Sequence, residues 1–194
     1  IGVGANQINS IVDKSLASLL GTEVVASFSY AIKLYEFVQA LFITSILAVI
    51  YPRLSSMIVS DRMDSFLNSL KKTMNVIIVA LVPIIVGCIV LSRQIVEVLF
   101  QRNAFTSKDT TMTASILWIY VIGILAFALR DVLTRGFYSM EDSKTPMINS
   151  IISIVFNISL NLILVKPLGY KGLAIATAVS AYIGLLLFNR SMRK

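Results

Sequence analysis

Histidine is absent from the sequence, and cysteine occurs once, as Cys88. The absence of histidine excludes the commonest general base and the commonest metal ligand of proteins. A single cysteine excludes a disulfide within the chain, and its place in the apolar run VPIIVGCIVL predicts packing against lipid or a neighbouring helix. The sequence also lacks a nucleophile–base pair, a metal-ligand cluster and a glycine-rich phosphate loop, which argues against an enzyme.

Charged residues are scarce as well. They make up 14% of the chain, whereas 57% of the residues are hydrophobic and the mean hydropathy is +0.84. A soluble domain has about 25% charged and about 45–50% apolar residues, so both differences predict an integral membrane protein. The net charge of +7 comes from basic residues in the connectors between apolar runs. Membrane topology explains them better than nucleic-acid binding, and no nucleic-acid partner is expected.

Apolar runs long enough to cross a bilayer alternate with charge and turn signals. Six runs are predicted to be membrane-spanning helices, at residues 2–20, 30–51, 73–92, 112–133, 147–165 and 173–189. The first of them is unusually polar, and Pro83 predicts a bend in the third. The fold class is therefore an all-α integral membrane protein, with residues 1–194 forming a single helical domain.

The connector between the second and third runs has an amphipathic pattern. Met63, Phe66, Leu67 and Leu70 fall on one helical face. This pattern predicts a short helix over residues 61–72 that lies in the membrane interface.

Basic residues are unevenly distributed between the two sides of the predicted membrane. One side holds the second-to-third connector, the C-terminal end, and Arg130, Arg135 and Lys144 in or near the fourth-to-fifth connector. That side has twice as many Lys and Arg residues as the other. The positive-inside rule therefore places it, and the C-terminal end, in the cytoplasm.

The stretch YAIKLYEF at 30–37 brings a cation and an anion to an apolar segment. Lys33 and Glu36 are three residues apart, so they share one face of a helix. One interpretation is an ion pair at the membrane boundary, with Tyr30 and Tyr35 in the usual aromatic belt. The other is a cavity-lining cation that attracts an anionic substrate.

Three further runs carry polar groups at membrane depth. Asp13 lies in the first run, where it is either neutralised by Lys14 near the outer interface or part of an ion or proton site. Asn157 and Asn161 share one helical face of the fifth run, either as hydrogen-bonding contacts between helices or as part of such a site. Thr177 of the sixth run can face the same location.

Two connectors contain long polar motifs. In LFQRNAFTSKDT at 99–110, Thr106 and Asp109 have the spacing of a capping box, with Asp in place of Glu. In GFYSMEDSKTP at 136–146, Asp142 or Ser143 begins a tight turn before the fifth run. Both motifs are interpreted first as structural.

These two motifs, with the opening GVGANQINSIVDKSLASLL and the stretch YAIKLYEF, strongly resemble the MurJ (MviN) family of lipid II flippases. That family belongs to the multidrug/oligosaccharidyl-lipid/polysaccharide exporter superfamily, and the whole chain resembles its seventh to about twelfth helices. The resemblance implies two helical lobes that face a central cavity and work by alternating access. It implies transport of lipid II, an undecaprenyl-diphosphate-linked glycopeptide, to the outer leaflet of the bacterial cytoplasmic membrane. The chain would then form most of the C-terminal lobe, in contact with membrane lipids and the missing N-terminal lobe.

The resemblance also assigns roles to the residues of YAIKLYEF. The family usually has Asp-Arg where this chain has Ile32 and Lys33, so the cation is kept and the acid is lost. The resemblance implies that Lys33 contacts the diphosphate, and that Glu36, which matches an acid of some members, holds Lys33 in place between cycles. Asn103 stands where the family mostly has Gly, an exchange that a left-handed backbone tolerates.

Some members of the family bind Na⁺ between helices that match the first, fifth and sixth runs. The resemblance implies that the ligands here would be Asp13, Asn157, Asn161, Thr177 and the Leu173 carbonyl. One ligand that is Asp in those members is Asn161 here, which lowers the charge of the site.

Two alternative functions stay open at this point. One is a related exporter that carries another polyprenyl-linked glycan or a drug cation. The other is a membrane scaffold that has the flippase fold and does not transport.

Overall fold

The computed structural model describes residues 2–192, with side chains described from Ile11 onward, and this part of the chain is helical with short connections. The elements are α1 (Gly2–Leu20), α2 (Thr22–Val38), the π-helix η1 (Gln39–Thr44), α3 (Ser45–Val59), α4 (Met63–Phe100), α5 (Ser107–Ser139), α6 (Lys144–Leu168) and α7 (Tyr170–Met192). The all-α prediction is confirmed.

The second predicted run is the middle of a much longer rod. α2, η1 and α3 follow one another without a break over Thr22–Val59, and the helix continues through Pro52. At about 1.5 Å per residue this rod is roughly 57 Å long, so it extends well beyond a hydrocarbon core of about 30 Å.

No separate helix forms at 61–72, so that prediction is wrong. Residues from Met63 onward are the first turns of α4, which runs unbroken to Phe100 and through Pro83. Between Met63 and Pro83 the sequence has no glycine or proline to end a helix. The apolar face of this segment is buried within the bundle, because Phe66 is inaccessible and Leu70 packs where a side chain on Gly136 of α5 would lie.

Five helices of the described chain are long and apolar enough to cross a membrane. They are the rod Thr22–Val59, α4, α5, α6 and α7. α1 covers the first of the six predicted runs, but its polar composition keeps it outside this set. It instead packs along α6, α2 and α7.

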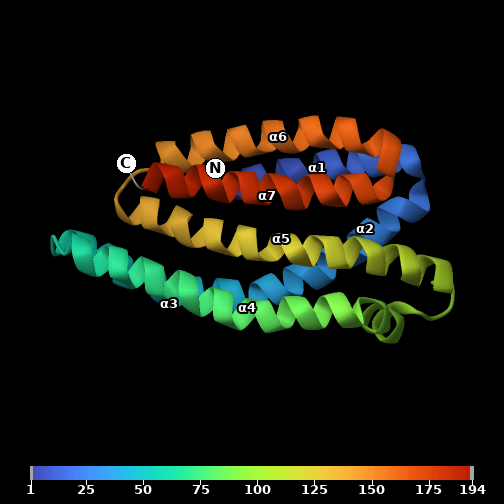
Figure 1. Ribbon diagram of the computed structural model, residues 1–194, viewed down its shortest axis with the longest axis horizontal. Coiled ribbons are helices and arrows are strands. Elements are labelled where there is room, and N and C mark those ends of the chain that lie inside the picture. Colours follow the sequence, from blue (N-terminus) through green and yellow to red (C-terminus); the bar gives the residue numbers. More distant parts are fainter. Residues whose placement is uncertain (1, 193–194) are drawn as a thin grey trace.

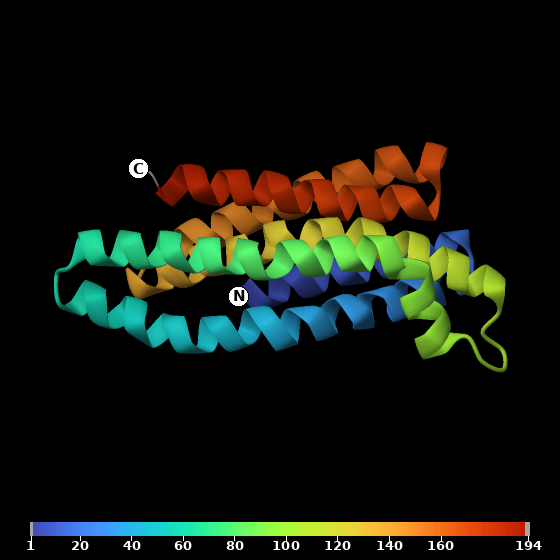
Figure 2. The ribbon, with the colours of Figure 1, turned by 60° about the horizontal axis from the view of Figure 1, so that its bottom comes forward.

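α5 is the central helix of the bundle. It packs against α2, α4 and α7, while α6 pairs with α7 and α1 lies on α6 (Figures 1 and 2). Small residues allow the close contact between α5 and α7, since a Cβ atom on Gly123 would lie 3.2 Å from the Cα atom of Ala178. The polar side chains that face this core are therefore enclosed on several sides.

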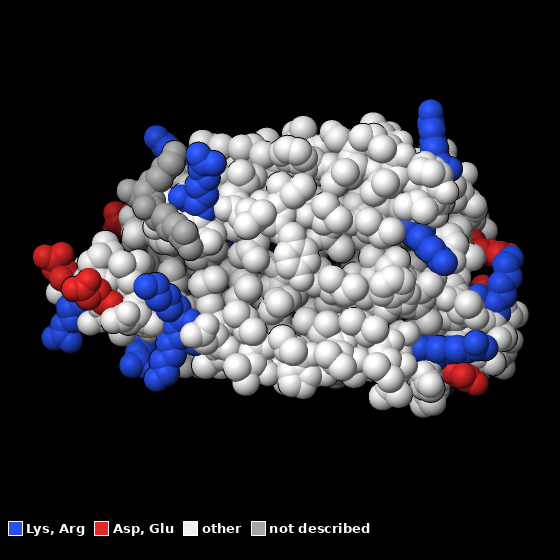
Figure 3. Space-filling view, in the orientation of Figure 1, with Lys and Arg blue, Asp and Glu red and all other residues white. Residues whose placement is uncertain are grey.

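Charged side chains gather at the two ends of the molecule, and a broad uncharged band separates them (Figure 3). The α3–α4 turn, the α5–α6 turn and the C-terminal end lie at one end, and the α1–α2, α4–α5 and α6–α7 connections lie at the other (Figure 1). On α4, Lys72 and Arg93 are roughly 30 Å apart along the helix, which matches the thickness of a hydrocarbon core. The predicted grouping of connectors is thus confirmed.

The loop before α5 has the predicted local structure. The backbone N–H of Thr106 donates to Asp109 Oδ2 at 2.8 Å, and the backbone N–H of Asp109 points to Thr106 Oγ1 at 3.5 Å, which completes the capping box. Asn103 has a φ of 51°, the left-handed conformation that an Asn-for-Gly exchange tolerates.

The turn before α6 also follows the prediction. Asp142 Oδ1 accepts hydrogen bonds of 3.0 Å from the backbone N–H groups of both Lys144 and Thr145. These bonds favour the charged carboxylate and lower the pKa of Asp142 below its ordinary value. Pro146 lies in the first turn of α6, where its missing N–H costs nothing.

Candidate functional site

A buried carboxylate lies at the meeting point of four helices. Asp13 of α1 is 2% exposed and accepts three side-chain hydrogen bonds. Asn161 Nδ2 of α6 donates to Oδ1 at 2.7 Å, whereas Thr177 Oγ1 of α7 and Tyr120 Oη of α5 donate to Oδ2 at 2.8 and 3.2 Å. Such a carboxylate sits far from solvent, so these donors are needed to stabilise it.

The hydrogen bonds continue into α6 and α7. Asn157 Nδ2 donates to Thr177 Oγ1 at 3.3 Å and to Ser180 Oγ at 3.2 Å, and Asn157 Oδ1 accepts from Asn161 Nδ2 at 3.1 Å. Thr177 Oγ1 also lies 3.1 Å from the Leu173 carbonyl oxygen. The Thr177 hydroxyl has one proton, so it can donate either to Asp13 Oδ2 or to the Leu173 carbonyl oxygen. The oxygen that does not receive this proton keeps a lone pair for another partner.

One oxygen of this network has no partner. Asn161 Oδ1 is buried and accepts no hydrogen bond from the part of the chain that the structure describes. A buried acceptor without a donor costs about 1–3 kcal/mol, and in a native protein it points to a role such as binding an ion. The structure thus brings together all five residues that the resemblance implied, Asp13, Asn157, Asn161, Leu173 and Thr177. We call this group, with Tyr120 and Ser180, the Asp13 cluster.

Tyr120 and Ser180 were not predicted from the sequence. Tyr120 lies in the middle of the apolar stretch of α5, remote in sequence from any other member of the cluster. A tyrosine at the centre of a span, away from the membrane boundary, is the one signal that could have drawn attention to it. Ser180 is one of several small residues of α7, so nothing in the sequence separates its hydroxyl from a packing role.

Lys33 and Glu36 lie on α2 and are both exposed. No ion pair joins them in the part of the chain that the structure describes, where the pairs found are Lys108–Glu23 and Arg130–Asp131. Lys33 Nζ instead lies 5.6 Å from the centre of the Tyr30 ring.

The two tyrosines near Lys33 have different surroundings. Tyr30 packs against Phe100 and Phe105, with ring centres 4.8 and 5.1 Å away. Tyr35 faces the bundle, where its ring packs edge-on against Tyr120 and Phe127 of α5. The prediction of an aromatic belt is therefore wrong for Tyr35, because the helix turn directs it toward α5.

A second buried polar group lies beside the π-helix. Arg130, which the sequence placed at or near a connector, is 7% exposed inside the bundle. Its Nη2 atom is 4.0 Å from Asp131 Oδ1, and its guanidinium lies 5.0 Å from the centre of the Phe127 ring. Gln39, the first residue of η1, donates to Asp131 Oδ2 at 3.4 Å. α5 continues to Ser139, so these charges belong to the helix and not to a loop.

The protein-family model described as "Lipid II flippase MurJ" matches residues 1–194. The chain belongs to the MurJ family of lipid II flippases. Curated relatives support this result. "Probable lipid II flippase MurJ" of Vibrio cholerae is 37% identical over 98% of this chain, which covers 36% of the relative. The Haemophilus influenzae protein of the same description is 34% identical over 100% of this chain and 39% of the relative.

Solved structures agree with this family. "Lipid II flippase MurJ, inward closed conformation" matches with a TM-score of 0.90 and 29% identity, over 100% of this chain and 41% of that one. A MOP superfamily transporter from Pyrococcus furiosus matches with a TM-score of 0.84 at 15% identity, which shows a shared fold alone. The chain spans about two fifths of the length of these relatives. The resemblance to the MurJ family and the membrane fold are confirmed, and membership of a flippase family points to a transporter and not to an enzyme.

Proposed function

We propose that the protein containing this chain flips lipid II from the inner to the outer leaflet of the bacterial cytoplasmic membrane. The observation that supports this most strongly is the match of the whole chain to the MurJ family, with a TM-score of 0.90 to a MurJ structure. The chain would supply part of one of two lobes that alternate access to a cavity between them. The end that carries the α3–α4 turn and the C-terminal end would face the cytoplasm, because it is the more basic one.

Lys33 is our candidate for contact with the diphosphate of the substrate. Its ammonium is exposed and has no carboxylate within 4.0 Å among the described residues, so its charge is available to an anion. A lysine presents a point charge where an arginine would present a two-pronged donor, which makes this contact less specific in direction. Glu36, one turn further along α2, is also exposed, and it would hold Lys33 in position in another state of the transport cycle than this one, in which no ion pair joins them.

The Asp13 cluster is our candidate for a Na⁺ site. The carboxylate of Asp13, the side-chain oxygens of Asn157, Asn161 and Thr177, and the Leu173 carbonyl form the hard oxygen set that such a cation prefers. Asn161 Oδ1 fits this role because it is buried and finds no hydrogen-bond donor among the described residues. The single carboxylate of the cluster balances the charge of a monovalent cation. Among the described residues there is no group of three or more His, Cys, Asp or Glu side chains that could hold a more highly charged ion. A bound cation would supply the charge that neutralises Asp13.

Occupation of this site would affect how the helices pack. Asp13 is the residue through which α1 hydrogen-bonds to α5, α6 and α7 in the described side chains. Asn161 and Thr177 would hold α6 and α7 on the same cation. The position of α1 relative to these helices would then depend on the cation, which gives an ion gradient a means of biasing the transport cycle.

The complete gene product tests this function directly. It is reconstituted into vesicles with fluorescent lipid II, and the lipid that reaches the opposite leaflet is measured by its accessibility to a membrane-impermeant reagent. We expect flipping of lipid II and none of a phospholipid of similar tail length. Transport of a drug cation or of another polyprenyl-linked glycan in preference to lipid II would favour a related exporter. Correct insertion without any transport would favour a scaffold.

A further inference from the structure

A cavity of about 740 Å³ lies between α3 and the first half of α4. α3 lies at the edge of the bundle, where it packs on α4, α5 and η1 (Figure 2). Cavities of roughly 300–1,000 Å³ are of the size that takes a small molecule or part of a lipid. None of the residues discussed above as substrate or Na⁺ ligands lines it.

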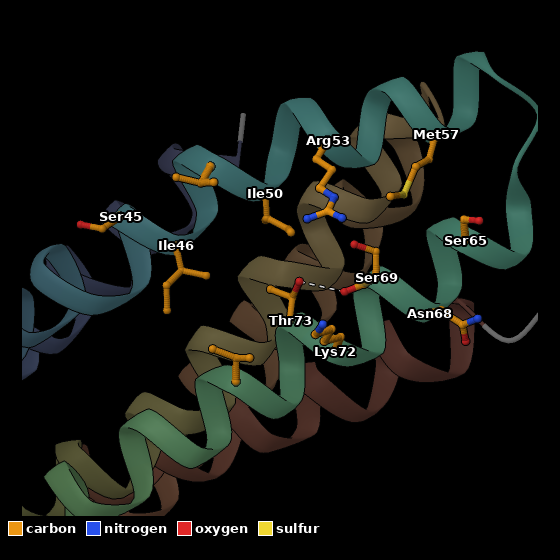
Figure 4. A pocket seen from close by; sticks show the side chains of 12 residues that line it. Ser45, Ile46, Ile50, Arg53, Met57, Ser65, Asn68, Ser69, Lys72 and Thr73 are labelled. Atoms are coloured by element: carbon orange, nitrogen blue, oxygen red, sulfur yellow. Dashed lines mark hydrogen bonds between the residues drawn. The ribbon is translucent and has the colours of Figure 1, made fainter.

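The end of the cavity near the α3–α4 turn is basic and polar. Figure 4 shows Arg53 extending from α3 toward α4, where Ser69 and Thr73 lie opposite and Lys72 stands beside Thr73. Asn68 and Ser65 of α4 and Ser45 of α3 are the other polar residues that line the cavity. Neither cation has a carboxylate within 4.0 Å in the described chain. The Thr73 hydroxyl donates to the Ser69 carbonyl oxygen at 2.8 Å, so the donors left for a ligand are the two cations, the Ser69 hydroxyl and the Asn68 amide. Such a group forms a site for a phosphate-type anion.

The other end of the cavity is apolar. It is lined by Ile46, Val49 and Ile50 of α3 and by Val76 of α4. From Arg53 to Ile46 the helix rises by roughly 10 Å, at about 1.5 Å per residue. The cavity therefore suits an amphiphile whose anionic head lies at Arg53 and Lys72 and whose tail follows α3 toward the middle of the bundle.

The depth of the two cations identifies the kind of amphiphile. The stretch of α4 between Lys72 and Arg93 has no charged residue and is roughly 30 Å long, so Lys72 lies at the depth of a membrane boundary. The headgroups of membrane lipids occupy this depth, and basic pockets between membrane helices bind anionic lipid headgroups. We propose that this cavity is a binding site for an anionic phospholipid, with its phosphate between Arg53 and Lys72 and an acyl chain against Ile50 and Val76.

Native mass spectrometry of the complete gene product, titrated in detergent with phosphatidylglycerol or phosphatidylethanolamine, tests this site. The double variant Arg53→Gln/Lys72→Gln should bind phosphatidylglycerol about ten- to thirty-fold more weakly, since each basic residue at an anionic lipid contributes about 1 kcal/mol. The control Arg93→Gln/Lys171→Gln loses the same charge from exposed positions at the other end and should bind as the wild type does.

A second variant tests whether binding depends on the space in the cavity as well as on the two cations. Val49→Trp fills the apolar end and leaves both cations in place, and it should also weaken the binding of phosphatidylglycerol. Affinity for phosphatidylglycerol that equals the wild type in both the double variant and Val49→Trp would overturn the proposal. The proposal would also be overturned if the double variant lost affinity for phosphatidylethanolamine as much as for phosphatidylglycerol, because the site would then not distinguish lipids by their charge. Loss of undecaprenyl-diphosphate binding with phosphatidylglycerol binding intact would assign the cavity to the transported lipid and would overturn it too.

Discussion

Replacing Asp13 with Asn tests the Na⁺ site with the smallest change in shape. The side chain keeps its size, but the negative charge at the centre of the Asp13 cluster disappears. In the wild type, Na⁺ that binds the folded protein stabilises it by RT ln(1 + [Na⁺]/Kd), about 2.7 kcal/mol when Na⁺ is at one hundred times Kd. Asp13→Asn should abolish most of this gain, because the remaining ligands, among them Asn161 Oδ1 and the Leu173 carbonyl, are neutral.

The measurement is thermal unfolding of the complete gene product in detergent, in NaCl and in choline chloride at equal ionic strength. For chains of 150–250 residues a gain of about 2.7 kcal/mol corresponds to a rise in Tm of roughly 5–10 °C. The relatives are longer than that, since this chain spans about two fifths of them, so the rise for the complete gene product should be smaller, on the order of a few °C. The loss of charged hydrogen bonds from Asn161, Thr177 and Tyr120 also changes the baseline stability of the variant. The informative quantity is therefore the difference between the two salts within each protein.

Asp109→Asn is the matched control. Asp109 is a carboxylate of the α5 capping box, outside the Asp13 cluster, so its replacement should lower the Tm equally in both salts. If Asp13→Asn keeps the sodium-specific rise in Tm, Asp13 does not bind the cation and the reasoning fails. A wild type whose Tm is the same in NaCl and choline chloride would refute the site altogether.

Three more predictions follow from the same structure. Asn161→Asp should increase the sodium-specific rise in Tm and lower the Tm in choline chloride, because two carboxylates then repel without a cation; a smaller rise would contradict it. Lys33→Ala should abolish the growth of a flippase-depleted strain that carries the complete gene, whereas Lys33→Arg should preserve it; full growth with the alanine variant would disprove the diphosphate contact. Asp142→Ala should destabilise the protein near pH 7 by roughly 0.5 kcal/mol, at the low end for helix caps because the group is exposed. The pKa of Asp142 is lowered on folding, so the difference in the free energy of unfolding between wild type and variant should be present above about pH 4 and disappear as the pH falls below it. Urea unfolding at several pH values measures this difference. A difference that persists at pH 2 would argue against the prediction.

The sequence was sufficient for local features. The capping box at Thr106 and Asp109 and the turn at Asp142 depend on hydrogen bonds between groups two or three residues apart, so the order of the residues decides them. The apolar runs likewise predicted the membrane helices, since a bilayer requires long stretches with few charges. The grouping of the connectors at two ends followed from the alternation of these runs.

Helix ends were harder to predict from composition. Hydropathy marked 30–51 and 73–92, but the helices extend to Thr22–Val59 and Met63–Phe100. Polar residues continue a helix when no glycine or proline stops it and when its apolar face finds a partner. The burial of Phe66 is such a contact, and it was not visible from the sequence.

Which polar side chains meet was decided by the tertiary structure. The residues alone left Asp13, Asn157, Asn161 and Thr177 open to several interpretations, and their grouping into one site came from the resemblance to a family. The bundle joins Tyr120 to Asp13, which are 107 positions apart in the sequence. It also buries Arg130 and joins Gln39 to Asp131, 92 positions further along the chain. The cavity between α3 and α4 depends on how two helices diverge. Such contacts join residues that are remote in the chain, so the packing of α1, α5, α6 and α7 decides them. The sequence by itself determined the order of the apolar runs and the two local capping motifs before α5 and α6.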